Sequence, residues 1–202
     1  MMLAAISGAL VLGSVGWLGA AAGSALVAEI DPLPESPSSS LPPVPWLVAG
    51  CAVLGAFIVP HAASMQIGVT ALVVFALVAA WCSDVQRGIV PDICTLGPLA
   101  AILFVAAIEH RPAAWLSATI VFVPFALTAW LSGGRGMGWG DVKLAALGGA
   151  VLGAPIALSA FAVASAVAAV VHWNAGVRGV PIAFAPYLAA AIGIGLAAGT
   201  PL

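Results

Sequence analysis

The chain has 202 residues, of which 63% are hydrophobic and only 6% are charged, and its formal net charge is −2. Soluble domains carry about a quarter charged residues, so this composition excludes an ordinary soluble protein and indicates a polytopic membrane protein. The sequence has no basic run that would bind a phosphate backbone, so we expect no nucleic-acid partner.

Apolar runs long enough to lie across a lipid bilayer recur along the chain. A hydrocarbon core of about 30 Å requires about 20 apolar residues per helix. The runs that we predict as spans cover residues 3–28, 46–60, 66–83, 95–108, 114–132, 142–172 and 181–199. We therefore expect an all-α, polytopic transmembrane helix bundle of about seven spans, within limits of six to eight. The glycine-rich run 142–172 is either one kinked span or two short ones, and the second interpretation gives eight.

The chain order predicts three parts. Residues 1–28 form a first transmembrane helix, because the run lacks a basic start and is longer than the apolar core of a secretory signal peptide, which is the alternative. Residues 29–45, "EIDPLPESPSSSLPPVP", predict an extended Pro/Ser-rich connector. Residues 46–202 form the remaining helical membrane domain.

Two aspartates stand at the boundaries of apolar runs. Asp84 ends the run "TALVVFALVAAWCS", where the negative end of the helix dipole disfavours a carboxylate. Its structural alternative is an ion pair with Arg87. Asp141 precedes "VKLAALGGAVLG", and its structural alternative is the N-cap of that helix. Since acids at membrane depth are costly and mark functional sites, both are candidate catalytic residues.

Glycines surround the second aspartate more densely than a helix cap requires. Gly138 and Gly140 flank Trp139 immediately before Asp141. They permit positive φ angles and, having no side chain, allow another backbone to lie close to the acid. An extended peptide substrate is one candidate for that backbone, so we assign Gly138 and Gly140 to substrate binding or to shaping of the loop.

The other polar residues have structural interpretations. We expect Asp92 to cap the helix that follows Pro91 and Lys143 to anchor its helix at the interface. The cysteines and histidines are isolated in the sequence, and none has a partner at metal-ligand spacing. We therefore predict no metal and no cofactor. These isolated residues are Cys51, Cys82, Cys94, His61, His110 and His172.

The spacing of the two aspartates leads to a chemical hypothesis. Two predicted spans separate them, so the chain returns to the side that it left and both acids face the same side. Two neighbouring carboxylates do not ionise together easily and share a proton near neutral pH. One then acts as a base on water and the other as an acid toward a peptide carbonyl, which is the chemistry of an aspartic protease.

Three segments resemble a known family. "GMGWGDVKLAAL" at 136–147 resembles the GxGD signature of the type IV prepilin peptidases, and "SDVQRGIVPDICT" at 83–95 is similar to the family's first aspartate segment. "VPIAFAPYLAAAIGIG" at 180–195 resembles the family's late helix. The resemblance implies that Asp84 and Asp141 are the catalytic pair. It implies substrates that are prepilin or pseudopilin precursors, cut after a short basic leader and before the hydrophobic pilin helix.

The chain departs from the larger members of that family. Those members carry a cysteine-rich cytoplasmic domain with N-methylating activity between their first two helices, where this chain has the connector 29–45 without cysteine. The resemblance is therefore to the short, peptidase-only form, and we expect no N-methyltransferase activity.

The predicted location is the cytoplasmic membrane, with the aspartates toward the cytoplasm. That orientation places Arg87, Arg135 and Lys143 inside and Arg111 outside. Arg178 lies outside if 142–172 is one span and inside if it is two, and either count favours this orientation by the positive-inside rule.

Other classes of function remain open at this point. They are a presenilin-like GxGD intramembrane protease, a non-catalytic membrane protein of pilus assembly, and a small proton-coupled transporter that uses the aspartates as relay groups. The sequence assigns no oligomeric state.

Overall fold

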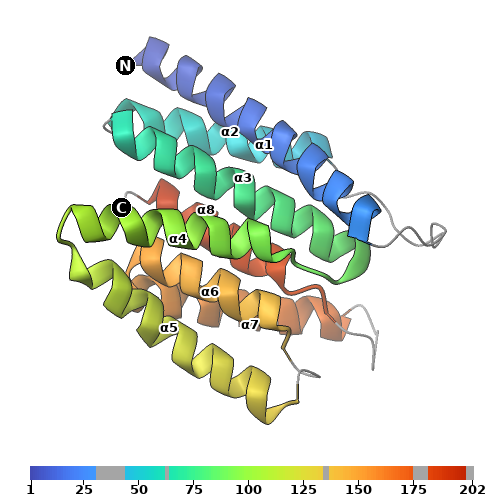
Figure 1. Ribbon diagram of the computed structural model, residues 1–202. Coiled ribbons are helices and arrows are strands. Elements are labelled where there is room, and N and C mark those ends of the chain that lie inside the picture. Colours follow the sequence, from blue (N-terminus) through green and yellow to red (C-terminus); the bar gives the residue numbers. More distant parts are fainter. Residues whose placement is uncertain (31–43, 62–63, 134–136, 175–181, 199–202) are drawn as a thin grey trace.

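The computed structural model describes residues 1–30, 44–61, 64–133, 137–174 and 182–198. These ranges contain eight α-helices, one short 3-10 turn and no β-strand, which confirms the predicted all-α class (Figure 1). The elements are α1 (Met2–Ile30), α2 (Val44–Ile58), η1 (Val59–His61), α3 (Ser64–Arg87), α4 (Asp92–Ile108), α5 (Pro112–Leu131), α6 (Trp139–Leu152), α7 (Ala154–Asn174) and α8 (Ala185–Ala197).

Within the described residues, four helices are long and apolar enough to cross a membrane, and α2, α4 and α8 are shorter apolar helices. The four long stretches are Met2–Val27, Gln66–Arg87, Pro112–Leu131 and Ala154–Asn174. Large apolar side chains such as Leu10, Phe104 and Val163 stand exposed on the outer surface of the bundle. Water would penalise so much exposed apolar surface, whereas lipid covers it, so the chain is a multi-pass membrane protein.

The long run 142–172 forms two helices. α6 ends at Leu152, Gly153 has a positive φ of +78°, which favours glycine, and α7 begins at Ala154. A Cβ atom on Gly148 would lie 2.4 Å from the ring of Phe161. In one continuous helix these residues would be about 20 Å apart. α7 therefore folds back along α6, so the run 142–172 is the two-helix alternative of the prediction, and the described residues contain eight α-helices.

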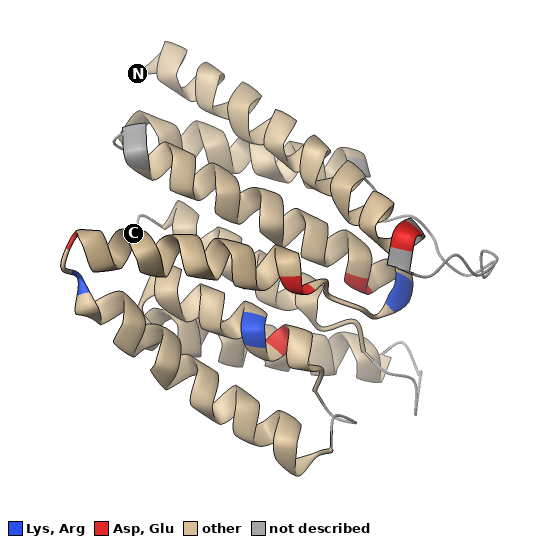
Figure 2. Cartoon of the chain, in the orientation of Figure 1, with Lys and Arg blue, Asp and Glu red and all other residues tan. Residues whose placement is uncertain are grey.

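The helices run back and forth between two ends of the bundle (Figure 1). α3 ends and α6 begins at the same end, so Asp84 and Asp141 belong to one end of the molecule, which we call the aspartate end. The charged residues that the structure describes lie at or near the ends of their helices (Figure 2). Two sets of predictions fall on residues that the structure does not describe. They are the extended connector, of which residues 31–43 lie outside the described residues, and the sides of the membrane assigned to Arg135 and Arg178.

The packing has a central helix. α6 contacts α4, α5, α7 and α8, and its residues from Val142 to Leu152 are buried except Lys143. α1 packs against α2 and α3 on the other side of the bundle. The closest approach there joins Gly8 and Gly55, where a Cβ on Gly8 would lie 2.2 Å from the Gly55 carbonyl oxygen. Glycine at such crossings allows helix backbones to approach closely in a bilayer.

Candidate active site

Asp84 lies in the last turn of α3 and is only 7% exposed. Its Oδ2 atom accepts a hydrogen bond of 3.0 Å from the backbone amide of Ala185, the first residue of α8. The first amides of a helix lack partners within that helix and carry its partial positive charge. The start of α8 therefore offsets the unfavourable dipole of α3 at the Asp84 carboxylate.

Asp141 is the third residue of α6 and is 8% exposed. The N-cap of this helix is Gly138, so the interpretation of Asp141 as the N-cap is wrong. The Gly138 amide donates a hydrogen bond back to the Asp141 carboxylate, which is half of a capping box. The other carboxylate oxygen, Oδ1, is buried and has no hydrogen-bond partner among the described residues.

The two aspartates influence each other electrostatically. The pKa of the Asp141 carboxyl, in the first turn of α6, is raised to about 7. Burial is the larger cause, and the charge of Asp84 is the second. α4 and α8 each pack against both α3 and α6, and so hold the two acidic helix ends together. The arrangement allows the pair to hold one proton near neutral pH, and that proton belongs to the pair.

The segment between α3 and α4 packs against the first turn of α6. A Cβ atom on Gly140 would lie 2.7 Å from the Cβ of Val90, so only glycine allows this approach. Gly138 has φ −75°, and Gly140 is also absent from the residues with positive φ, so neither glycine uses the positive φ angles that the sequence permits. The backbone beside Gly140 is that of Val90, whose carbonyl oxygen would lie 3.5 Å from the added Cβ.

An ion pair joins the same two regions. Lys143 of α6 contacts the Asp92 carboxylate of α4, with Nζ 2.5 Å from Oδ1. Lys143 therefore holds an acid on a neighbouring helix, a contact that the sequence did not predict. Asp92 is also not the N-cap of its helix, because that position belongs to Pro91.

Sequence reasoning missed the backbone groups of this site. It did not identify the amides of Ala185 and Gly138 or the contact of Val90, because each depends on an approach between helices or on a local cap geometry. The available signal was Pro186, since proline near the first position of a helix marks an N-terminus whose amides lack intrahelical partners.

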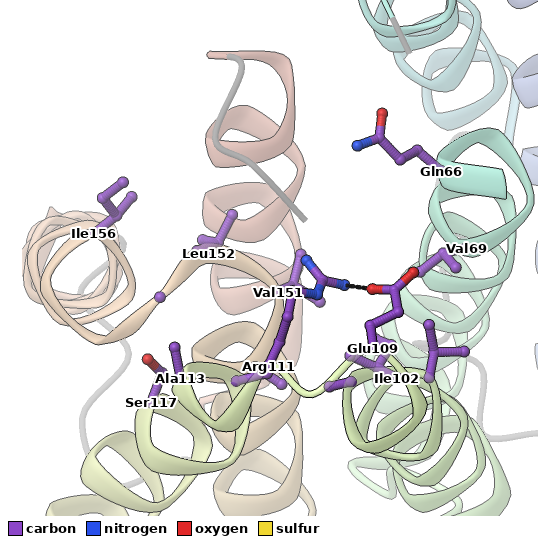
Figure 3. Close-up of a pocket in the computed structure, with 15 residues that line it drawn as sticks. Gln66, Val69, Ile102, Glu109, Arg111, Ala113, Ser117, Val151, Leu152 and Ile156 are labelled. Carbon is purple, nitrogen blue, oxygen red and sulfur yellow. Dashed lines mark ion pairs between the residues drawn. The ribbon is translucent and has the colours of Figure 1, made fainter. Parts of the chain in front are cut away.

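The larger of two prominent cavities lies away from the aspartates. It has a volume of about 450 Å³ and is bordered by the turn between α4 and α5 and by Gly153. Glu109 and Arg111 form an ion pair of 2.6 Å in its wall (Figure 3). Because these residues lie at the opposite end of α4 from Asp92, this cavity is not part of the aspartate site.

The potential metal ligands remain scattered in the part of the chain that the structure describes, with no group of three histidine, cysteine or acidic side chains. The three cysteines are free and buried.

Comparison with known proteins identifies the family. No curated protein sequence and no solved structure gave a match to the chain. The type IV leader peptidase family matches residues 70–173, which are 104 of the 202 residues and include both Asp84 and Asp141. The chain belongs to the type IV leader peptidase family.

Proposed function

We propose that this protein is a membrane aspartyl endopeptidase that removes the short basic leader from prepilin or pseudopilin precursors. The observation that carries the proposal is the pair of buried carboxylates, Asp84 and Asp141, which interact electrostatically at one end of the bundle. Burying two acids together is costly for a fold, and a catalytic pair accounts for that cost. The absence of a cysteine-rich segment leads us to propose the peptidase activity alone.

In the proposed reaction Asp84 is the base and Asp141 is the acid. The Ala185 amide stabilises an ionised Asp84, which takes a proton from a water molecule as the water oxygen attacks the scissile carbonyl carbon. Asp141 donates its proton to the carbonyl oxygen, which gives a tetrahedral diol. The diol then collapses, the C–N bond breaks, the leaving amine takes the proton held by Asp84, and a hydroxyl proton returns to Asp141. The raised pKa and the unpartnered Oδ1 of Asp141 support this assignment.

We place the protein in the cytoplasmic membrane with the aspartate end toward the cytoplasm. Among the described residues, two basic side chains, Arg87 and Lys143, lie at the aspartate end and one, Arg111, lies at the other end, which favours this orientation by the positive-inside rule. A membrane-impermeant maleimide applied to intact cells tests the orientation. It should label Ala113→Cys and spare Ile89→Cys, and the reverse pattern would exclude this orientation.

The function is tested by expressing the protein in cells together with candidate pilin precursors and following leader removal by gel shift. We expect processing by the wild type and none by Asp84→Asn or Asp141→Asn. Glu109→Gln is the matched control, because it removes a carboxylate at the opposite end of the bundle and should process normally. Normal processing by either aspartate variant, present in the membrane at wild-type level, would exclude the proposed chemistry.

A further inference from the structure

An apolar groove opens on the surface of the bundle between α2, α3 and α8, with a volume of about 320 Å³. Every residue that lines it is apolar, and the lining includes Trp46 and Gly50 of α2, Leu77 and Trp81 of α3, and Ala189 and Gly193 of α8. Trp46 at its edge is 77% exposed. In a bilayer such a groove accepts an apolar occupant without any polar group to satisfy.

The groove leads to the aspartate end. Trp81 precedes Asp84 by three residues and Ala189 follows Ala185 by four, so each lies one helical turn from the Asp84–Ala185 hydrogen bond and on the same helix face. Along α3 the lining extends from Val74 to Trp81, which is about 10 Å or two helical turns. An occupant that lies in the groove therefore has one end beside the Asp84 carboxylate.

Small residues shape the groove for close contact. Gly50, Ala189 and Gly193 line the groove, and a Cβ atom on Gly50 would meet no atom within 4 Å. Small residues of this kind allow a second helix to pack closely in a membrane, where hydrophobic burial between helices supplies little driving force. The groove therefore suits a helix as its occupant better than a flat lipid-facing surface would.

We infer that this groove receives the apolar transmembrane helix of the precursor and thereby sets the bond that is cut. The inference rests on the proposed function. With the helix in the groove, the chain that precedes it leaves at the aspartate end, so the peptide bond at the boundary between leader and helix lies at Asp84. The groove is then the part of the enzyme that measures where the leader ends.

The test compares two helical glycines that both have open space. Gly50→Leu fills the groove, and Gly97→Leu makes the same change on α4, where a Cβ also meets no atom within 4 Å. Each variant is assayed on the full precursor in vesicles and on a short peptide that spans the cleavage site but lacks the apolar helix. Gly50→Leu should lower kcat/KM for the full precursor at least about tenfold and leave the short peptide within about twofold. Gly97→Leu should match the wild type on both substrates.

A photo-cross-linking amino acid in place of Trp46 gives a second readout, and it should capture the apolar segment of the precursor. Wild-type cleavage of the full precursor by Gly50→Leu, an equal loss on both substrates, or capture of lipid alone would overturn the groove assignment. In each of these cases the wild type still cleaves, so the proposed function stands. If the wild type itself cleaves neither substrate, the proposed function fails, and the groove assignment fails with it.

Discussion

Asp84 and Asp141 each receive a hydrogen bond from a backbone amide that begins a helix, Ala185 of α8 for the first and Gly138 of α6 for the second. A backbone amide donates regardless of its side chain, and the partial positive charge of the helix start favours the ionised acid. Burial acts in the opposite direction on Asp141 and raises its pKa to about 7. In the proposed mechanism, the balance between these effects keeps one proton on the aspartate pair near neutral pH.

The contact of Gly140 with Val90 predicts different outcomes for two neighbouring glycines. Gly140→Ala places a Cβ 2.7 Å from the Val90 Cβ, which forces the α3–α4 segment away from α6 at a cost of about 1–3 kcal/mol. Leader removal should fall strongly because the two aspartates separate. Gly138→Ala meets only the Asp141 carboxylate at 3.5 Å and should cost less than about 1 kcal/mol.

Processing assays and thermal unfolding of both variants check this difference. Val90→Gly added to Gly140→Ala should restore part of the activity, since it removes the atom that clashes. Equal behaviour of the two alanine variants would show that the Val90 contact does not position the site.

The raised pKa of Asp141 predicts a pH-dependent gain in stability for Asp141→Asn. The folded protein holds this proton up to about pH 7, whereas the unfolded chain releases it near the ordinary value of 3.8, so wild-type stability falls as pH rises between these values. Asparagine has no proton to release and pays no cost for a buried charge. The variant should therefore match the wild type near about pH 4 and be the more stable one near about pH 8.

Thermal unfolding in detergent at the two pH values measures the effect. Each 1 kcal/mol corresponds to about 2–4 °C for a chain of this size, and we expect at least that gain near neutral pH. An unfolding-temperature difference that is the same at both pH values would mean that Asp141 does not titrate in this range.

At the level of helices, the glycines determine where the chain turns and where helices meet. Gly153 ends α6 with a positive φ, and Gly8 and Gly55 allow α1 to contact α2 closely. The two uses are chemically different, because the first depends on backbone conformation and the second on the missing side chain. Sequence alone shows the glycines but does not separate these uses.

The helix crossing at Gly8 predicts a contrast within α1. Gly8→Ala places a Cβ 2.2 Å from the Gly55 carbonyl oxygen, so α1 must move and the unfolding temperature should fall by several degrees. Gly13→Ala makes an ordinary contact of 3.4 Å with Ala52 and should leave stability unchanged or raise it slightly, because alanine favours the helix. Thermal unfolding of the two variants checks the contrast, and a larger loss for Gly13→Ala would contradict this packing of α1.

The helices and the positions of both aspartates at helix ends followed from local patterns. Apolar runs predicted the all-α bundle, and their boundaries placed Asp84 and Asp141 at span ends. The break at Gly153 stayed undecided because glycine and proline fit both a kink and a turn. The contacts of Ala185, Val90 and Lys143 join residues more than 40 positions apart, and no local pattern encodes them.

At the scale of the whole molecule, charge and burial are separated along the bundle. The described charged residues lie at or near the ends of their helices (Figure 2), and α6 runs from Asp141 at the aspartate end into the buried core. The apolar groove beside α3 and α8 reaches the same aspartate end. In the proposed mechanism, a membrane-embedded substrate is held along the bundle and cut at the aspartate end.

The most direct test of the account is the rate of leader removal by purified protein, for the wild type, Asp84→Asn, Asp141→Asn and the double variant. If the two acids act as one catalytic unit, each single variant should lose at least about 10³-fold in kcat, and the double variant should lose no more than a single one. Activity within about tenfold of the wild type in either folded single variant, or losses that multiply in the double variant, would contradict the paired-aspartate mechanism.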